Sequence, residues 1–189
     1  MASPDVRAGA LLVSSTELVE PTFRRTVIYL IEHNGEGSLG VVLNRPSDTA
    51  VQNVLPAWAP HAVRPQALFV GGPVKRDSAL CLGVLQPGVD ADRVPGLRPV
   101  EGRVVMVDLD ANPDDVMPLL GGVRVFVGYA GWSAGQLDAE LGRVDWLVLP
   151  SLPSDVVMPG RVDVWARVLR RQPMPLAMLA TLPVDVDRN

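Results

Sequence analysis

The fold of this 189-residue chain follows from residues 25–44, which read RTVIYLIEH (25–33), NGEG (34–37) and SLGVVLN (38–44). The first and last of these segments are rich in β-branched and aromatic side chains, which favour extended strands. The Asn-Gly step and the second glycine between them permit the positive φ angles that a tight turn requires. Residues 25–44 therefore predict an antiparallel hairpin.

Further strands and a few helices are predicted outside this hairpin. The expected strands span residues 10–14, 67–70, 79–85, 103–109, 124–129 and 146–149. The expected helices span residues 49–55, 113–120, 133–141 and 161–171, and the Pro-rich segments 56–65 and 87–99 are expected to be surface loops. Strand follows strand with helices inserted irregularly, unlike the regular alternation of a doubly wound sheet.

The predicted helix ends carry local signals. Asn112 is a good N-cap, and Pro113 suits the first helical position because its missing N–H is not needed there. Ser133 and Gln136 have the spacing of a capping box, and Gly142 is expected to end that helix.

Composition limits both the class of protein and its partners. The chain carries 48% hydrophobic and 20% charged residues, which is ordinary globular usage and suits one domain over residues 1–189. Its formal net charge of −4 argues against nucleic-acid binding through bulk positive charge. Its one cysteine excludes an intrachain disulfide framework and a zinc site built from several cysteines.

The sequence predicts a cytoplasmic protein without a membrane span. Its longest stretch without acidic or basic residues, 49–63, is 15 residues long, whereas a bilayer span needs about 20 apolar residues. Asp5 lies where a signal peptide carries positive charge, and the apolar segment 8–13 is too short for a signal core.

The segment Gly131-Trp-Ser-Ala-Gly135 matches the G-x-S-x-G pattern of a nucleophile elbow. A serine nucleophile needs a base, and in α/β-hydrolases the histidine follows the serine in sequence. Here His33 and His61 both precede Ser133. The alternative interpretation is a glycine-rich turn in which Ser133 caps a helix.

Neither a cofactor nor a metal site is expected. Gly71-Gly-Pro73 lacks the Lys-Ser/Thr of a phosphate-binding loop, and no G-x-G-x-x-G follows a predicted strand. The acidic and histidine residues lack metal-ligand spacing. Cys81 lies in an apolar strand, where burial raises the pKa of a thiol and suppresses its reactivity.

Several segments taken together resemble the YqgE/AlgH family. They are Gly9–Val13, Phe23–Val27, Glu32-His33, Gly40–Pro46, Gly71–Val74, Gly128–Trp132 and Gly135–Leu137. The resemblance covers nearly the whole chain in the expected order. It implies an α+β fold, with a mostly antiparallel bent sheet or pseudo-barrel and a few packed helices. It also implies a bacterial cytoplasmic protein from a family commonly labelled as transcriptional regulators.

Nine residues at strand ends and in loops form the predicted binding site. They are Arg24, Thr26, His33, Asn44, Arg45, Gly71, Gly72, Trp132 and Gln136. If the fold brings them together, they supply hydrogen-bond donors, a guanidinium and an aromatic wall, and the glycine-rich helix start adds N–H groups for an anion. The structural alternative is that Asn44 and Arg45 satisfy buried carbonyls while the glycines permit turns.

These patterns favour a non-catalytic binding or regulatory protein over an enzyme. The expected partner is an unidentified protein or small ligand, with no direct nucleic-acid contact and no membrane. The alternatives are a serine hydrolase using Ser133 and a regulator that binds DNA directly. The helix over Arg161–Arg171, with four arginines and one aspartate, either faces solvent or contacts an acidic partner. The oligomeric state stays open.

Overall fold

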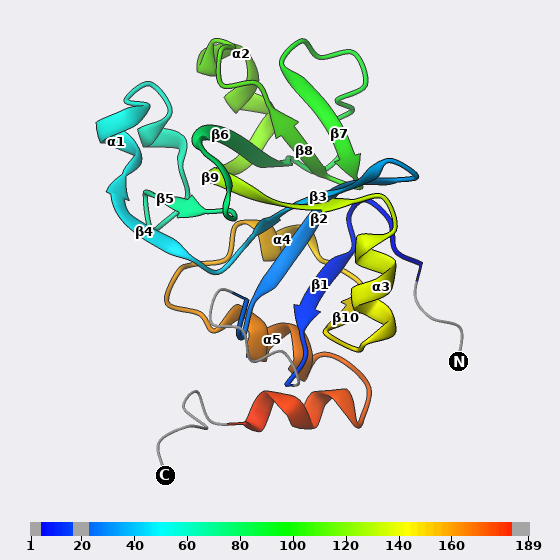
Figure 1. The fold of residues 1–189 in the computed structure, drawn as a ribbon. Coiled ribbons are helices and arrows are strands. Elements are labelled where there is room, and N and C mark those ends of the chain that lie inside the picture. Colours follow the sequence, from blue (N-terminus) through cyan, green and yellow to red (C-terminus); the bar gives the residue numbers. More distant parts are fainter. Residues whose placement is uncertain (1–4, 17–22, 183–189) are drawn as a thin grey trace.

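The computed structural model of the chain describes residues 5–16 and 23–182, which are organised around a curled β-sheet (Figure 1). The strands are β1 (Leu11–Ser14), β2 (Val27–Asn34), β3 (Gly37–Val42), β4 (Pro46–Ala50), β5 (Ala67–Val70), β6 (Val74–Leu85), β7 (Leu97–Glu101), β8 (Val104–Val107), β9 (Leu120–Ser133) and β10 (Trp146–Leu149). Within the described residues their order is β10-β1-β2-β3-β9-β6-β8-β7, and β5 pairs with β9 and β4. The β5–β9 pair is parallel, whereas the other strand pairs are antiparallel. The predicted hairpin is confirmed as β2 and β3, paired from Ile28↔Val42 to Asn34↔Gly37.

The helices are short and pack around this sheet. They are α1 (Val51–Val54), α2 (Pro113–Val116), α3 (Gln136–Gly142), α4 (Pro153–Val156) and α5 (Val164–Arg170), with 3-10 turns at Ala59–His61, Met117–Leu119 and Leu176–Thr181. A mainly antiparallel, curled sheet with few helices confirms the predicted α+β fold. No helix in residues 5–16 and 23–182 combines the length and apolar character needed to cross a bilayer.

The sheet buries both of its faces, which explains the nearly continuous apolar strands. In β2, Val27, Tyr29 and Ile31 lie in the core that includes residues of α4 and α5. Their neighbours Ile28 and Leu30 point to the opposite face, into a core that includes Leu137 of α3. A third core contains residues of β6 and β9 together with residues of α1 and α2.

Strand β9 connects the two parts of the sheet. It pairs with β6 from Leu120 to Tyr129, with β3 from Ala130 to Ser133, and with β5 at Phe126 and Val127. Near the change of partner, Gly128 adopts a φ of +71°, a conformation that favours glycine. The bent strand thereby directs its last residues toward α3.

Two assignments from the sequence, one helix and one loop, need correction. The predicted 49–55 helix is reduced to α1 because residues 46–50 form β4, and Pro46 begins that strand, where a missing N–H is tolerated. The predicted 87–99 loop ends earlier because Leu97 begins β7. Pro99 fits inside β7 because this strand ends the described strand order, leaving one side without a partner strand.

The helix starts are partly confirmed. The Asn112 side chain accepts a hydrogen bond from the Asp114 N–H at 3.0 Å, as predicted for an N-cap. The prediction of Ser133 as an N-cap is wrong because Ser133 ends β9 and Gly135, with a φ of +77°, caps α3. Of the predicted capping box, the structure retains the contact in which Gln136 Oε1 accepts the Ser133 N–H at 3.1 Å.

Candidate functional site

A cavity of about 310 Å³ lies between β9, α3 and β10. Its lining residues come from distant parts of the sequence: Phe23, Pro73, Val74, Ala130, Gly131, Trp132, Gln136, Glu140, Arg143, Asp145 and Trp146. Strands β9 and β10 are separated by three strands in the sheet order, but the sheet curls (Figure 1), and both strands contribute residues to this cavity. This volume lies near the lower end of the range for ligand pockets, about 300–1,000 Å³.

Three aromatic rings form one wall of the cavity. The centroids of Trp132 and Trp146 are 6.4 Å apart with an interplanar angle of 82°. Phe23 stands edge-on to Trp146 at 5.7 Å and 73°. These edge-to-face pairs hold the rings in fixed orientations, each worth about 0.5–1.5 kcal/mol beyond area burial.

Glu140 joins the aromatic wall to α3. Its Oε2 accepts the indole N–H of Trp132 at 2.7 Å and that of Trp146 at 3.1 Å. Its Oε1 has a longer contact, 3.4 Å, from the Gln136 amide. A single carboxylate therefore orients both indoles, because each indole has only one donor group.

The turn after α3 closes the polar end of the cavity. Arg143 donates from Nε and Nη2 to Oδ2 of Asp145 at 3.1 and 3.0 Å. Between them Val144 has a φ of +60°, a left-handed conformation that is strained for a β-branched residue. The Val144 carbonyl accepts a hydrogen bond from the Ser15 hydroxyl at 2.6 Å.

Hydrogen bonds gather four of the nine predicted residues at the ends of β2 and β3. The Arg45 guanidinium donates to the Arg24 carbonyl at 2.7 Å and to the Thr26 hydroxyl at 3.0 Å. Asn44 donates to the Arg25 carbonyl at 2.8 Å and accepts the Val27 N–H at 3.1 Å. These contacts match the structural interpretation of Asn44 and Arg45. Burial lowers the pKa of Arg45 below its ordinary value.

Gly71 and Gly72 lie where β5 passes to β6 beside β9. The Gly71 N–H donates to the Val127 carbonyl at 2.8 Å, and the Gly71 carbonyl accepts the Val42 N–H at 2.9 Å. A Cβ on Gly72 would collide with the Tyr129 backbone. Both glycines therefore permit a close approach to the backbone of β9 that a larger residue would prevent.

The remaining predicted residues lie toward α3. Trp132 and Gln136 line the aromatic cavity. His33 lines a neighbouring cavity of about 350 Å³, together with Ser38, Ser133 and Asp138. The Nδ1 atom of His33 lies 2.6 Å from the Ser38 hydroxyl. The Ser133 hydroxyl instead contacts Gln136 Oε1, at 3.3 Å.

Sequence reasoning missed Phe23, Glu140 and Trp146. The spacing of Gln136 and Glu140 on one predicted helix face was the available signal, because residues four apart are neighbours on a helix. Trp146 lay in a predicted strand. Its meeting with Trp132 depends on the curl of the sheet, which no local pattern encodes.

A buried arginine was also missed. Arg124 of β9 donates to the carbonyls of Met158 at 2.5 Å and Arg64 at 2.9 Å, and its guanidinium lies 4.1 Å from the Phe69 ring centroid. Burial lowers the pKa of Arg124 to about 10. These contacts fix two loops to the sheet, so its role in the described residues is structural.

Comparison with known proteins identifies relatives over almost the whole chain. Residues 11–177 match the family described as AlgH-like. A UPF0301 protein of Rhodococcus jostii is 69% identical over 186 residues, covering 98% of this chain and 92% of the relative. A UPF0301 protein of Mycolicibacterium smegmatis is 62% identical over 184 residues, covering 97% of this chain and 92% of the relative.

Two solved structures share the fold. The crystal structure of a Corynebacterium diphtheriae protein superposes with a TM-score of 0.93 at 46% identity, covering 96% of this chain and 95% of that one. The solution structure of the AlgH protein from Pseudomonas aeruginosa gives a TM-score of 0.66 at 28% identity, covering 98% of both chains. The resemblance inferred from the sequence motifs is therefore confirmed.

Proposed function

The chain belongs to the AlgH-like family, and we propose that it is a non-catalytic binding protein whose ligand occupies the cavity between Trp132 and Trp146. The ligand is a small molecule or a short segment of a partner protein. The observation that carries this proposal is the paired indole contact with Glu140, which holds two large aromatic side chains at the edge of a cavity. Pockets lined by aromatic groups with a few fixed polar atoms are typical of ligand sites.

Indole N–H signals in ¹H–¹⁵N NMR spectra provide a direct test. The chain has four tryptophans, and Trp58 and Trp165 donate to the carbonyls of Leu109 and Ser14, outside this cavity. A mixed fragment library should include compounds that shift the Trp132 and Trp146 signals and leave the other two unchanged. If fragments of every charge class leave Trp132 and Trp146 unmoved, the binding proposal is wrong.

A serine hydrolase is the second candidate, and one contact favours it. His33 lies within hydrogen-bond distance of Ser38, and both residues line a cavity with Ser133 and Asp138. Against this candidate, the Ser133 hydroxyl contacts Gln136, and Ser38 is 9% exposed. A fluorophosphonate probe followed by peptide mass spectrometry decides the question, because stoichiometric labelling of Ser133 or Ser38 would establish a nucleophile.

Regulation through a protein partner in the cytoplasm is part of the proposal. The net charge of −4 supports protein or small-ligand recognition more than direct DNA contact. On α5, Arg167 and Arg170 are exposed, so an acidic partner has access to them. A sequence-dependent electrophoretic shift of DNA at moderate salt would instead establish the direct regulator.

A further inference from the structure

We infer that the Trp132–Trp146 cavity selects an organic cation, a primary ammonium or guanidinium on a short alkyl chain, with Glu140 as its counter-charge. The inference rests on the proposed function and adds the chemical class of the ligand. It follows from the charges that line the cavity, from the hydrogen bonds already made by Glu140, and from the aromatic wall.

The charged residues of the cavity leave one carboxylate without a cation. Arg143 and Asp145 neutralise each other through two hydrogen bonds of 3.1 and 3.0 Å. Within residues 5–16 and 23–182, Glu140 forms no ion pair, and the donors on its Oε2 are two neutral indoles. Within the described residues, no cation therefore neutralises the Glu140 carboxylate at the cavity wall.

Glu140 also has unused hydrogen-bonding capacity. Oε2 is occupied by two indole donors, whereas the contact from Gln136 to Oε1 is long, at 3.4 Å. A carboxylate oxygen accepts about two hydrogen bonds, so Oε1 has room for a strong donor. A charged donor gains the most there, because charge-assisted hydrogen bonds are roughly twice as strong as neutral ones.

The aromatic wall favours the same ligand class. Tryptophan is the side chain whose ring face attracts cations most strongly, and Trp132 and Trp146 both line the cavity. An anion would meet the negative charge of Glu140. A neutral apolar ligand would remove water from the Glu140 carboxylate without replacing its hydrogen bonds, which is unfavourable.

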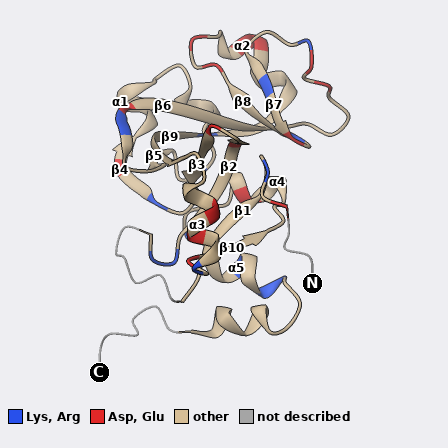
Figure 2. Cartoon of the chain, turned by 45° about the vertical axis from the view of Figure 1, so that its right-hand side comes forward, with Lys and Arg blue, Asp and Glu red and all other residues tan. Residues whose placement is uncertain are grey.

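The surroundings reinforce this preference. Both charged residues of α3, Asp138 and Glu140, are acidic (Figure 2). A second cavity of about 400 Å³ shares Val74, Gly131 and Trp132 with the first. Of its two acidic lining residues, Glu32 pairs with Arg98 at 3.1 Å, whereas Glu36 forms no ion pair within the described residues. A cation approaching from this side therefore experiences a favourable field.

The cation could be a free small molecule or the basic side chain of a peptide, since both present the same charged group. NMR titration of the full chain distinguishes the two: n-butylammonium represents the free cation, and N-acetyl-lysine methylamide and the peptide acetyl-Ala-Lys-Ala-amide represent the side chain. N-acetyl-norleucine methylamide is the neutral control, and N-acetyl-glutamate methylamide is the anionic one. We expect the cationic probes to shift the Trp132 and Trp146 indole signals with at least about tenfold higher affinity than the neutral control.

Glu140→Gln tests the counter-charge, and Asp138→Asn is its matched control. Both changes remove one negative charge from α3, but Asp138 does not line this cavity. We expect Glu140→Gln to lower cation affinity about tenfold or more. Asp138→Asn changes only the surrounding electrostatic field, so we expect it to lower cation affinity by no more than about twofold. The Trp58 and Trp165 signals report whether each variant is folded.

The possible failures are distinguishable. If neutral or anionic probes bind as well as cations, or Asp138→Asn weakens binding as much as Glu140→Gln, the cation assignment is wrong while the binding function stands. If neither these probes nor the fragment library moves the two indole signals, both proposals fail. Should Glu140→Gln not fold, the probe series on the unmodified chain still decides the charge preference.

Discussion

The carboxylate of Asp155 accepts two hydrogen bonds from the guanidinium of Arg171, at 2.7 and 2.6 Å, at a position where Asp155 is completely buried. The same carboxylate accepts the Leu152 N–H at 2.7 Å. This pair connects the start of α4 to the residue after α5. Part of the basic segment 161–171 therefore serves an internal contact.

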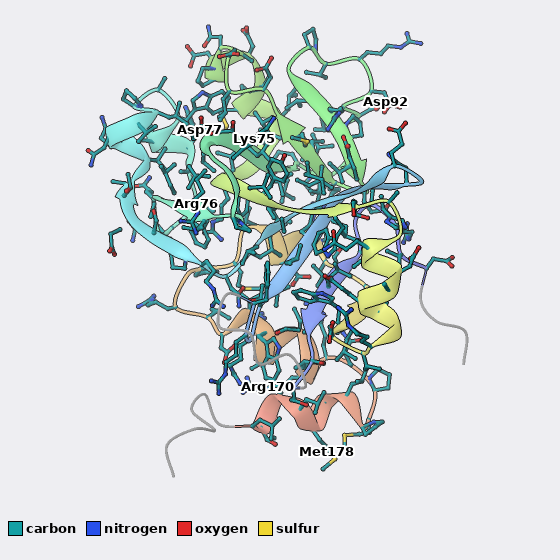
Figure 3. The ribbon with its side chains drawn as sticks, in the orientation of Figure 1. Lys75, Arg76, Asp77, Asp92, Arg170 and Met178 are labelled. Atoms are coloured by element: carbon teal, nitrogen blue, oxygen red, sulfur yellow. The ribbon has the colours of Figure 1, made fainter. Side chains whose placement is uncertain are left out.

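Removing the cation of this pair should strongly destabilise the protein. Arg171→Ala leaves a buried carboxylate without its counter-charge, and breaking buried pairs costs roughly 3–5 kcal/mol. Because the Arg171 side chain is 25% exposed, we expect a loss of about 3 kcal/mol in the free energy of unfolding, measured with urea. Arg170→Ala, at the neighbouring exposed residue labelled in Figure 3, should change it by less than about 0.5 kcal/mol.

Arg45→Ala distinguishes a structural residue from a ligand contact. The variant loses charged hydrogen bonds to the Arg24 carbonyl and the Thr26 hydroxyl, and Thr26 is completely buried. Because Arg45 is itself only partly buried, the expected loss is about 1–2 kcal/mol in urea unfolding. Arg93→Ala, at an exposed arginine, is the control. A fully stable Arg45→Ala protein that no longer binds its ligand would instead place Arg45 in the binding site.

Cys81 should make stability fall at alkaline pH. Burial raises the pKa of its thiol from 9.0 to about 12, so the folded chain retains a proton that the unfolded chain releases. Its contribution is complete below pH 9 and is lost as the pH rises toward 12. At pH 10.5 this loss amounts to about 2 kcal/mol relative to pH 8.

Cys81→Ala lacks this alkaline loss. The stability difference between the original chain and the variant should therefore narrow between pH 8 and 10.5 in urea unfolding. A constant difference across that range would show that the thiol does not titrate differently in the two states. The native thiol should also resist alkylation until the protein unfolds.

Val144→Gly should stabilise the turn beside the aromatic cavity. Val144 has a φ of +60° and is 54% exposed, so glycine relieves backbone strain while little packing is lost. We expect a gain of about 1 kcal/mol in thermal or urea unfolding. Val54→Gly is the matched control, because Val54 is 53% exposed but helical, and there a loss of about 0.5 kcal/mol is expected. Destabilisation by Val144→Gly would contradict the strain argument.

Sequence patterns predicted the secondary-structure elements that are determined by residues close together in the sequence. The β2–β3 hairpin follows from its apolar runs and its glycine-rich turn. The apolar face of α5 follows from the spacing of Val164, Trp165, Val168 and Leu169, all of which are buried. Strand β7 was missed because Pro99 resembles a loop residue unless the position of its strand at the sheet edge is known.

The candidate site depended on relationships that no local pattern contains. Trp132 and Gln136, two of the residues predicted to bind a ligand, line a cavity, but Trp146 beside them belongs to a strand on the far side of β1, β2 and β3 in the sheet order. The side chains of Asn44 and Arg45 have polar groups of the kind that bind ligands, yet in the structure they hydrogen bond to backbone groups of residues 24–27. The type of hydrogen-bonding group in a side chain does not by itself show whether the residue binds a ligand or stabilises the fold.

The central position of β9 has a consequence during synthesis. Strands β3, β5 and β6 emerge from the ribosome well before residues 120–133, which supply their shared neighbour. At about 5–20 residues per second, the growing chain exposes unpaired apolar strand edges for several seconds. A nascent chain halted before residue 120 should therefore recruit chaperones and aggregate when released, whereas one extended past α5, which completes the core on one face of the sheet, should fold.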